Sequence, residues 1–97
     1  MSTLHVLSHS PFGDDRLSSC LRVIGANDAL LLCGDAAYAL RPGTAPFSVL
    51  NARSLDLYVL IEDAHARAID VPDWAKAIDY PAFVELSIHH DKVNSWL

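Results

Sequence analysis

The chain has 97 residues and a mass of 10.6 kDa, too small for two independently folded domains, so we expect a single domain over residues 1–97. Hydrophobic residues make up 52% of the chain and charged residues 20%, a composition that excludes intrinsic disorder. The formal net charge of -5 has the wrong sign for binding nucleic acid through its phosphates. Any role in RNA chemistry is therefore expected to be indirect.

The apolar runs are a few residues long, well below the ~18 residues that a membrane-spanning helix needs. The first residues lack the basic region of a secretory signal, so a cytoplasmic location is expected. Cys20 and Cys33 have neither the CxxC spacing of a redox or metal motif nor enough companions for a disulfide framework. We expect both cysteines to be free thiols.

The first half of the chain predicts two strands, each followed by a helix. Residues 3–8 form an apolar run that a turn at 10–13 ends, and Asp14 or Asp15 can cap a helix whose buried face carries Leu17, Leu21 and Ile24. Continuous apolar character after Asp28 predicts a second, central strand at 28–33. Asp35 then opens a short helix over 36–40 that Arg41, Pro42 and Gly43 end.

The second half repeats the alternation after an irregular segment. Residues 41–54 are expected to form a mobile loop in which 47–50 could be part of a short helix. The remaining elements are a strand at 55–61, a helix from 62, a short strand near the end of 74–78, a helix from 80, and an edge strand or packed tail at 91–97. This order predicts an α/β fold: an open parallel sheet of four to five strands with helices on both faces.

The sequence contains no motif for a nucleotide or a metal. Its four glycines form neither a G-x-G-x-x-G nor a G-x-x-x-x-G-K-[ST] run, so no phosphate cradle is expected. Its five histidines have no metal-ligand spacing and are read as surface or half-buried imidazoles. The acidic pairs Asp14-Asp15 and Glu62-Asp63 lie at helix starts, where capping explains them without catalysis. Neither a cofactor nor a metal is expected.

Cys20 is the candidate reactive residue. Helical geometry places it at the border of the buried stripe, with Arg16 one turn earlier on the same face, where a guanidinium could stabilise a thiolate. The alternative is that Cys20 is a small buried hydrophobe, because no dedicated base accompanies it. Cys33 ends a central strand, where burial is expected unless a crevice opens at the carboxyl edge of the sheet.

Several short segments, in unbroken order over nearly the whole chain, resemble the TusB/DsrH family of sulfur-relay subunits. They are Leu4-His5, Ser10-Pro11-Phe12, Asp28 to Leu32, Leu57 to Leu60, Glu62-Asp63, Ala66-Arg67, Ile78-Asp79-Tyr80, Phe83-Val84, Leu86, His90 and Trp96. Ala68 stands where relatives often have Gly, a difference that affects only a helix end.

The resemblance implies a small α/β subunit in a heterohexamer with TusC/DsrF-like and TusD/DsrE-like chains. Such a complex takes persulfide sulfur from a TusA-like donor and passes it to a TusE/DsrC-like acceptor. The sulfur ends in the 2-thio group of wobble uridine in tRNA or, in the related branch, serves dissimilatory sulfur oxidation. The principal persulfide cysteine of the family belongs to the TusD/DsrE-type partner. The resemblance therefore leaves open whether this chain is itself an enzyme.

In DsrH-type relatives a cysteine also lies on the first helix, and Cys20 matches it. The resemblance implies that Cys20 can attack the outer sulfur of a persulfide, with Arg16 as electrostatic support. The competing interpretations are an interaction subunit without its own thiol chemistry and a stand-alone small-molecule-binding domain. Phe12, Tyr80 and Trp96 are candidate interface residues, with ordinary core packing as the alternative.

Overall fold

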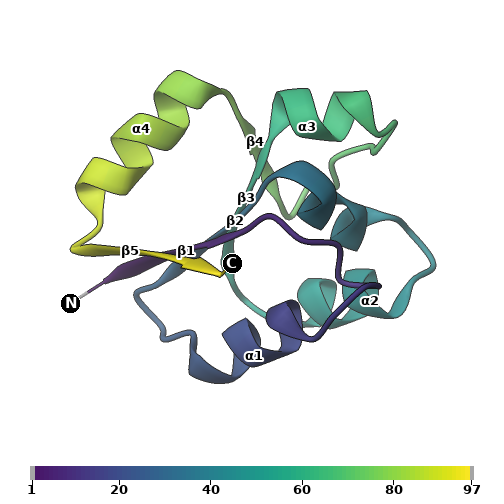
Figure 1. Cartoon of the computed structure of the whole chain (residues 1–97), viewed down its shortest axis with the longest axis horizontal. Coiled ribbons are helices and arrows are strands. Elements are labelled where there is room, and N and C mark those ends of the chain that lie inside the picture. Colours follow the sequence, from purple (N-terminus) through teal and green to yellow (C-terminus); the bar gives the residue numbers. More distant parts are fainter. Residues whose placement is uncertain (1, 97) are drawn as a thin grey trace.

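The chain forms one sheet of five parallel strands in the order β4-β3-β2-β1-β5 in a computed structural model that describes residues 2–96 (Figure 1). The strands are β1 (Thr3–Leu7), β2 (Ala29–Leu32), β3 (Asp56–Leu60), β4 (Lys76–Ile78) and β5 (Lys92–Trp96). In the register, Leu4 of β1 lies opposite Ala29 of β2 on one side and Val93 of β5 on the other. The predicted parallel α/β fold is confirmed, and the C-terminal segment is an edge strand.

Helices connect the strands as the alternation predicts. They are α1 (Arg16–Val23), the 3₁₀ helix η1 (Gly34–Leu40), α2 (Ala45–Ala52), α3 (Ile61–Ala66) and α4 (Tyr80–His89). Within residues 2–96 none of them is long and apolar enough to cross a lipid bilayer.

The expectation of a mobile loop over residues 41–54 is wrong for most of that segment. Residues 45–52 form α2, which begins with Pro46 in its first turn, where the missing N–H of proline costs no helical hydrogen bond. Leu50 anchors the helix in the core with 1% of its surface exposed, and the ring of Phe47 stacks edge-on against Trp74 at 5.2 Å. Tertiary packing therefore orders a segment whose glycine and prolines indicated a loop.

The two faces of the sheet are covered unequally. The larger core lies on one face and collects side chains from α1, η1, α2 and α3, among them Leu17, Ala37, Leu50 and Ala64. The smaller core lies on the other face, where Phe83 and Leu86 of α4 are only partly buried. Indeed, α4 has no fully buried residue. The sheet is thus sealed on one face and thinly covered on the other.

Candidate functional site

The carboxyl ends of β1, β2 and β3 meet at one edge of the sheet, and Cys33 lies there. This thiol is half-buried, and its Sγ donates to the carbonyl oxygen of Leu7 at 3.4 Å. Burial raises the pKa of Cys33 above its ordinary value, the Asp63 carboxylate raises it further, and Arg67 opposes the shift. Cys33 is the more accessible of the two thiols, because it is half-buried whereas Cys20 is fully buried.

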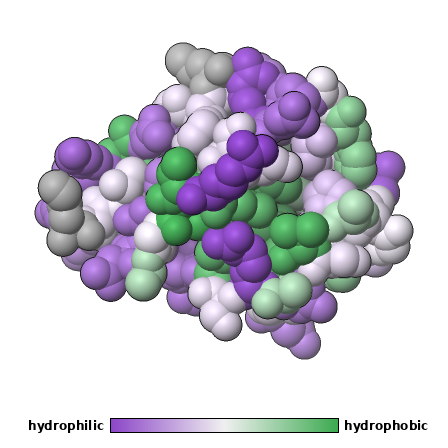
Figure 2. All heavy atoms as spheres, turned by 90° about the horizontal axis from the view of Figure 1, so that it is seen from below, coloured by the Kyte–Doolittle hydropathy of each residue, from purple (hydrophilic) through white to green (hydrophobic). Residues whose placement is uncertain are grey.

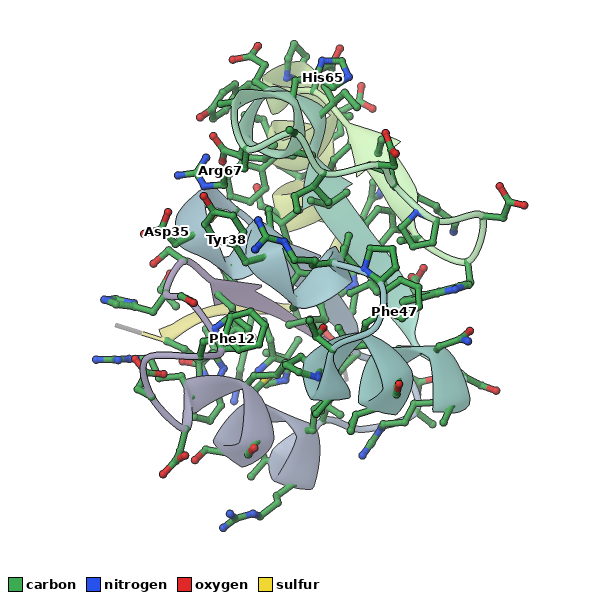
Figure 3. The ribbon with its side chains drawn as sticks, turned by 90° about the vertical axis from the view of Figure 1, so that its right-hand side faces the viewer. Phe12, Asp35, Tyr38, Phe47, His65 and Arg67 are labelled. Atoms are coloured by element: carbon green, nitrogen blue, oxygen red, sulfur yellow. The ribbon has the colours of Figure 1, made fainter. Side chains whose placement is uncertain are left out.

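A network of charged and aromatic side chains surrounds this edge (Figure 3). The Arg67 guanidinium bonds Asp35 through Nε at 3.0 Å and also donates to the backbone oxygen of Asp63 at 3.1 Å. The ring of Tyr38 receives two guanidiniums, Arg41 at 5.0 Å and Arg67 at 5.9 Å from its centre. The sequence analysis missed this grouping, although it placed residues 35 and 63 just after neighbouring parallel strands, whose carboxyl ends share an edge.

Asp63 does more than complement the dipole of its own helix. Its Oδ2 accepts a hydrogen bond from the backbone N–H of Gly34 at 2.7 Å, which ties α3 to the end of β2. Gly34 has φ +52, and a Cβ at this position would lie 3.2 Å from the carbonyl oxygen of Ser8. The turn that presents Cys33 therefore depends on a glycine.

Gly34→Ala is expected to lower the free energy of unfolding by ~1–3 kcal/mol, because the left-handed backbone strains any side chain and the Ser8 oxygen crowds it. Urea denaturation measures this change. Gly13→Ala is the matched control: a Cβ there meets nothing closer than 3.7 Å, so a change of less than ~0.5 kcal/mol is expected. Equal losses in the two variants would contradict the assigned strain.

Cys20 lies on α1 against the larger core, not at the border that helical geometry predicted. Its exposed fraction is 0%, and it shares the buried face of the helix with Leu17 and Leu21. Burial raises the pKa of this thiol to about 11; Asp28 adds to the rise, and Arg53 opposes it. The predicted border position is wrong because a short side chain close to the helix axis is covered by its longer neighbours. In the isolated chain the Cys20 thiol does not meet solvent.

Arg16 does not face the Cys20 thiol. Its guanidinium pairs with the carboxylate of Asp14, whose Oδ1 also accepts the backbone N–H of Arg16 at 2.9 Å. These contacts, led by the backbone hydrogen bond, hold the pKa of Asp14 below its usual range. The expected support of a Cys20 thiolate by Arg16 is wrong for this structure, because an acidic neighbour two residues away competes for the guanidinium.

A buried histidine joins three separated parts of the chain. The indole Nε1–H of Trp96 donates to Nδ1 of His5 at 3.1 Å, and Nε2 of His5 lies 3.2 Å from Oδ2 of Asp28. The backbone N–H groups of Gly25 and Thr3 also donate to the carboxylate, and the Gly25 bond contributes most to lowering the pKa of Asp28. We read this chain of bonds as structural: it fastens β5 to β1 and to the turn before β2.

The three candidate interface residues fall into different environments. Phe12 is 56% exposed and Tyr80 is 49% exposed, so both are free to meet a partner. Trp96 is half-buried and packs against the larger core while its indole bonds His5, which favours the core-packing alternative. Within the described residues, no three His, Cys, Asp or Glu side chains gather in a way that could hold a metal ion.

Comparison with known proteins assigns the chain to a family. The model of the family described as "DsrH like protein" matches residues 9–93. Protein TusB of Erwinia tasmaniensis is 36% identical over 95 residues, which are 96% of this chain and 99% of the relative. The TusB proteins of Pectobacterium parmentieri and Yersinia enterocolitica are 36% and 33% identical over the same coverage.

The solved structures give the same fold. The crystal structure of the ychN protein from E. coli superposes with a TM-score of 0.72, covering 98% of this chain and 99% of that chain at 19% sequence identity. At this sequence identity the structural similarity is evidence for the fold alone. The assignment rests on the family model and on the full-length TusB relatives. The chain belongs to the DsrH-like family, the TusB/DsrH family of sulfur-relay subunits that its sequence resembles.

Proposed function

We propose that this chain is a subunit of a cytoplasmic TusBCD/DsrEFH-like complex that relays persulfide sulfur from a TusA-like donor to a TusE/DsrC-like acceptor. Its companions in the complex are TusC/DsrF-like and TusD/DsrE-like chains, and the sulfur ends in the 2-thio group of wobble uridine in tRNA. The observation that carries the proposal is the match to TusB proteins over nearly the whole of both chains. The net charge of -5 suits a subunit that does not itself bind tRNA.

The transfer chemistry is thiol exchange. An acceptor thiolate attacks the outer, sulfane sulfur of a donor persulfide, the S–S bond of the donor breaks, and the donor leaves as a thiolate. The product is a persulfide on the acceptor, so the exchange needs no external oxidant or reductant. The attacking sulfur must reach the donor and must be ionised.

Cys20 meets neither requirement in the isolated chain, because it is fully buried and its pKa is raised to about 11. We infer that the principal sulfur carrier lies on a partner and that this chain acts mainly through its surfaces. A carrier role for Cys20 requires that binding of a partner displace α1. The second candidate, an interaction subunit without its own thiol chemistry, is thus favoured by the burial of Cys20.

The surface of α4 supports a role in assembly. Tyr80, Val84 and Ile88 follow one another at intervals of four residues along the helix, and they are 49%, 56% and 74% exposed. Only Glu85 and His89 of this helix are ionisable besides Tyr80. A helix that is apolar on its outer side as well as its inner side is typical of one buried on both sides, here between its own sheet and a partner chain.

Native mass spectrometry of the tagged chain, purified from its own cells, tests the proposal. The expected result is a complex with two related small chains and added sulfur on the TusD/DsrE-like chain. Added sulfur on this chain that disappears in Cys20→Ala would instead establish Cys20 as a carrier. A bare monomer would refute the relay assignment.

The destination of the sulfur needs a separate measurement. Deletion of the gene is expected to remove 2-thiouridine from tRNA, which liquid chromatography of the nucleosides detects, and Cys20→Ala is expected to leave thiolation intact. Unchanged thiolation in the deletion strain would favour the dissimilatory branch of sulfur metabolism.

A further inference from the structure

The imidazole ring of His5 is buried between a hydrogen-bond donor and a carboxylate. His5 lies on β1 with 4% of its surface exposed, opposite Leu30 of the larger core, on the face of the sheet that α1 and α2 cover. Figure 2 shows the molecule from the side of these helices, where hydrophilic side chains surround and cross a central apolar area. The indole Nε1–H of Trp96 donates to Nδ1 at 3.1 Å, and Nε2 lies 3.2 Å from Oδ2 of Asp28. Both ring nitrogens are therefore engaged inside the protein.

These contacts determine which ring nitrogen of His5 carries the proton. An indole N–H can only donate, so Nδ1 must offer its lone pair. The backbone N–H of Gly25, and to a lesser extent that of Thr3, hold the pKa of the Asp28 carboxyl below its usual range. Asp28 is therefore ionised and accepts the hydrogen bond, so Nε2 must donate it. The neutral ring with its proton on Nε2 satisfies both partners.

A second proton on the ring would break one of these two bonds. Nδ1–H would face the indole N–H across 3.1 Å, and two donors cannot bond each other. The bond to Asp28 would remain and become an ion pair. Within residues 2–96 Nδ1 bonds the Trp96 indole alone, so the indole is the group that must leave.

The strand that carries Trp96 is easier to move than the strand that carries His5. In the sheet order, β1 is paired on both sides, whereas β5 is an edge strand that pairs with β1 alone. Residues 92–95 of β5 are exposed, and Trp96 at its end packs against the larger core. Segments with few buried contacts open first, so the end of β5 is the part that responds.

The other charged and titratable groups near His5 keep their charge between about pH 8 and about pH 5, where an imidazole titrates. Lys92 is exposed on the same face of β5, two residues before Asn94, which lies opposite His5 in the register. Arg53 lines a hollow together with Asp28, and both cations stay charged in this range. Burial raises the pKa of the Cys20 thiol on α1 to about 11, so this thiol stays neutral. The ring of His5 is thus the group whose charge acid changes here.

We propose that His5 and Trp96 form a pH-sensitive switch at the edge of the sheet: protonation of His5 at Nδ1 releases the Trp96 indole, and the C-terminal end of β5 detaches from β1. The proton comes from solvent and stays on the ring, which keeps its contact with Asp28. Acid thereby uncovers the part of the larger core against which Trp96 packs. This inference goes beyond the sulfur relay and does not depend on it.

Nitrogen-15 NMR of the unaltered full chain tests the switch. At about pH 8 the His5 ring is expected to carry its proton on Nε2 and none on Nδ1. As acid protonates the second nitrogen, hydrogen exchange of the Trp96 indole N–H is expected to speed up ~10-fold or more relative to that of Trp74. Nuclear Overhauser effects between the indole and Leu7, its neighbour in the register, are expected to vanish in the same transition.

Two variants separate a switch from a merely structural contact. Trp96→Phe keeps an aromatic ring but removes the bond that favours the neutral imidazole, so the midpoint of His5 protonation is expected to rise by about 0.5–1 pH unit. His5→Asn offers the indole an amide oxygen that acid does not protonate, so the transition of Trp96 is expected to disappear. His9→Asn is the matched control: His9 is exposed, and its loss should leave the transition unchanged.

Four results would overturn the proposal. They are a proton on Nδ1 of His5 at about pH 8, an indole that keeps its contacts while His5 gains its second proton, an unchanged midpoint in Trp96→Phe, and a His5 that stays neutral until the whole chain unfolds in acid. Thermal unfolding shows whether each variant is folded. Should His5→Asn fail to fold, the unaltered chain and Trp96→Phe still decide the question, because neither changes the buried ring.

Discussion

Val84→Asp combined with Ile88→Asp is expected to release the chain from its complex while leaving its own fold intact. The two side chains are 56% and 74% exposed, so carboxylates at these positions stay hydrated in the free chain, and the free energy of unfolding should change by less than ~0.5 kcal/mol per site. At an interface the same carboxylates lose water without gaining a partner. Affinity for the partner chains should therefore fall ~30-fold or more.

Co-purification from cells and native mass spectrometry measure the loss of the complex, and urea denaturation measures the fold. Val23→Asp is the matched control, because Val23 is 61% exposed on α1 and lies outside α4. A double variant of α4 that keeps its partners would remove this helix from the proposed interface. Loss of the complex in the Val23 control alone would move that interface to α1.

Alkylation with iodoacetamide is expected to modify Cys33 long before Cys20 in the folded chain. Burial raises the pKa of both thiols, that of Cys20 to about 11. The difference in rate is expected from access, because Cys20 has no exposed surface whereas Cys33 is half-buried. Mass spectrometry of the variants Cys33→Ala and Cys20→Ala follows each thiol separately. Rapid modification of Cys20 in the folded, isolated chain would contradict its burial.

The same experiment in the purified complex decides whether partners open α1. Continued protection of Cys20 supports the role of interaction subunit. Modification of Cys20 that depends on the partner would restore the carrier role.

The raised pKa of Cys20 also predicts a dependence of stability on pH. Below pH 9 the thiol is protonated in both states, and its contribution to stability is fully present. As the pH rises from 9.0 towards about 11, the unfolded chain releases this proton first, so the free energy of unfolding should fall by up to roughly 3 kcal/mol. The difference between the wild-type chain and Cys20→Ala isolates this part of the alkaline loss.

The sequence by itself determined the fold and the family. The apolar runs of β1, β2 and β3 and the helical stretches between them required a parallel sheet, because β2 is apolar throughout and must be covered on both faces. The order of short matching segments identified the TusB/DsrH family. Both properties depend on the order of residues along the chain, not on contacts between segments that are far apart in the sequence.

Only the tertiary structure decided the surroundings of individual side chains. Cys20 is buried because longer side chains cover it. Arg16 pairs with Asp14 because that carboxylate competes for its guanidinium. Helical spacing alone predicts neither contact. Asp63 binds the N–H of Gly34 and Arg67 binds Asp35, because parallel strands bring segments some thirty residues apart to one edge. The sheet also brings Trp96 to His5: β5 pairs with β1, so two residues 91 positions apart share a hydrogen bond that no single stretch of sequence contains.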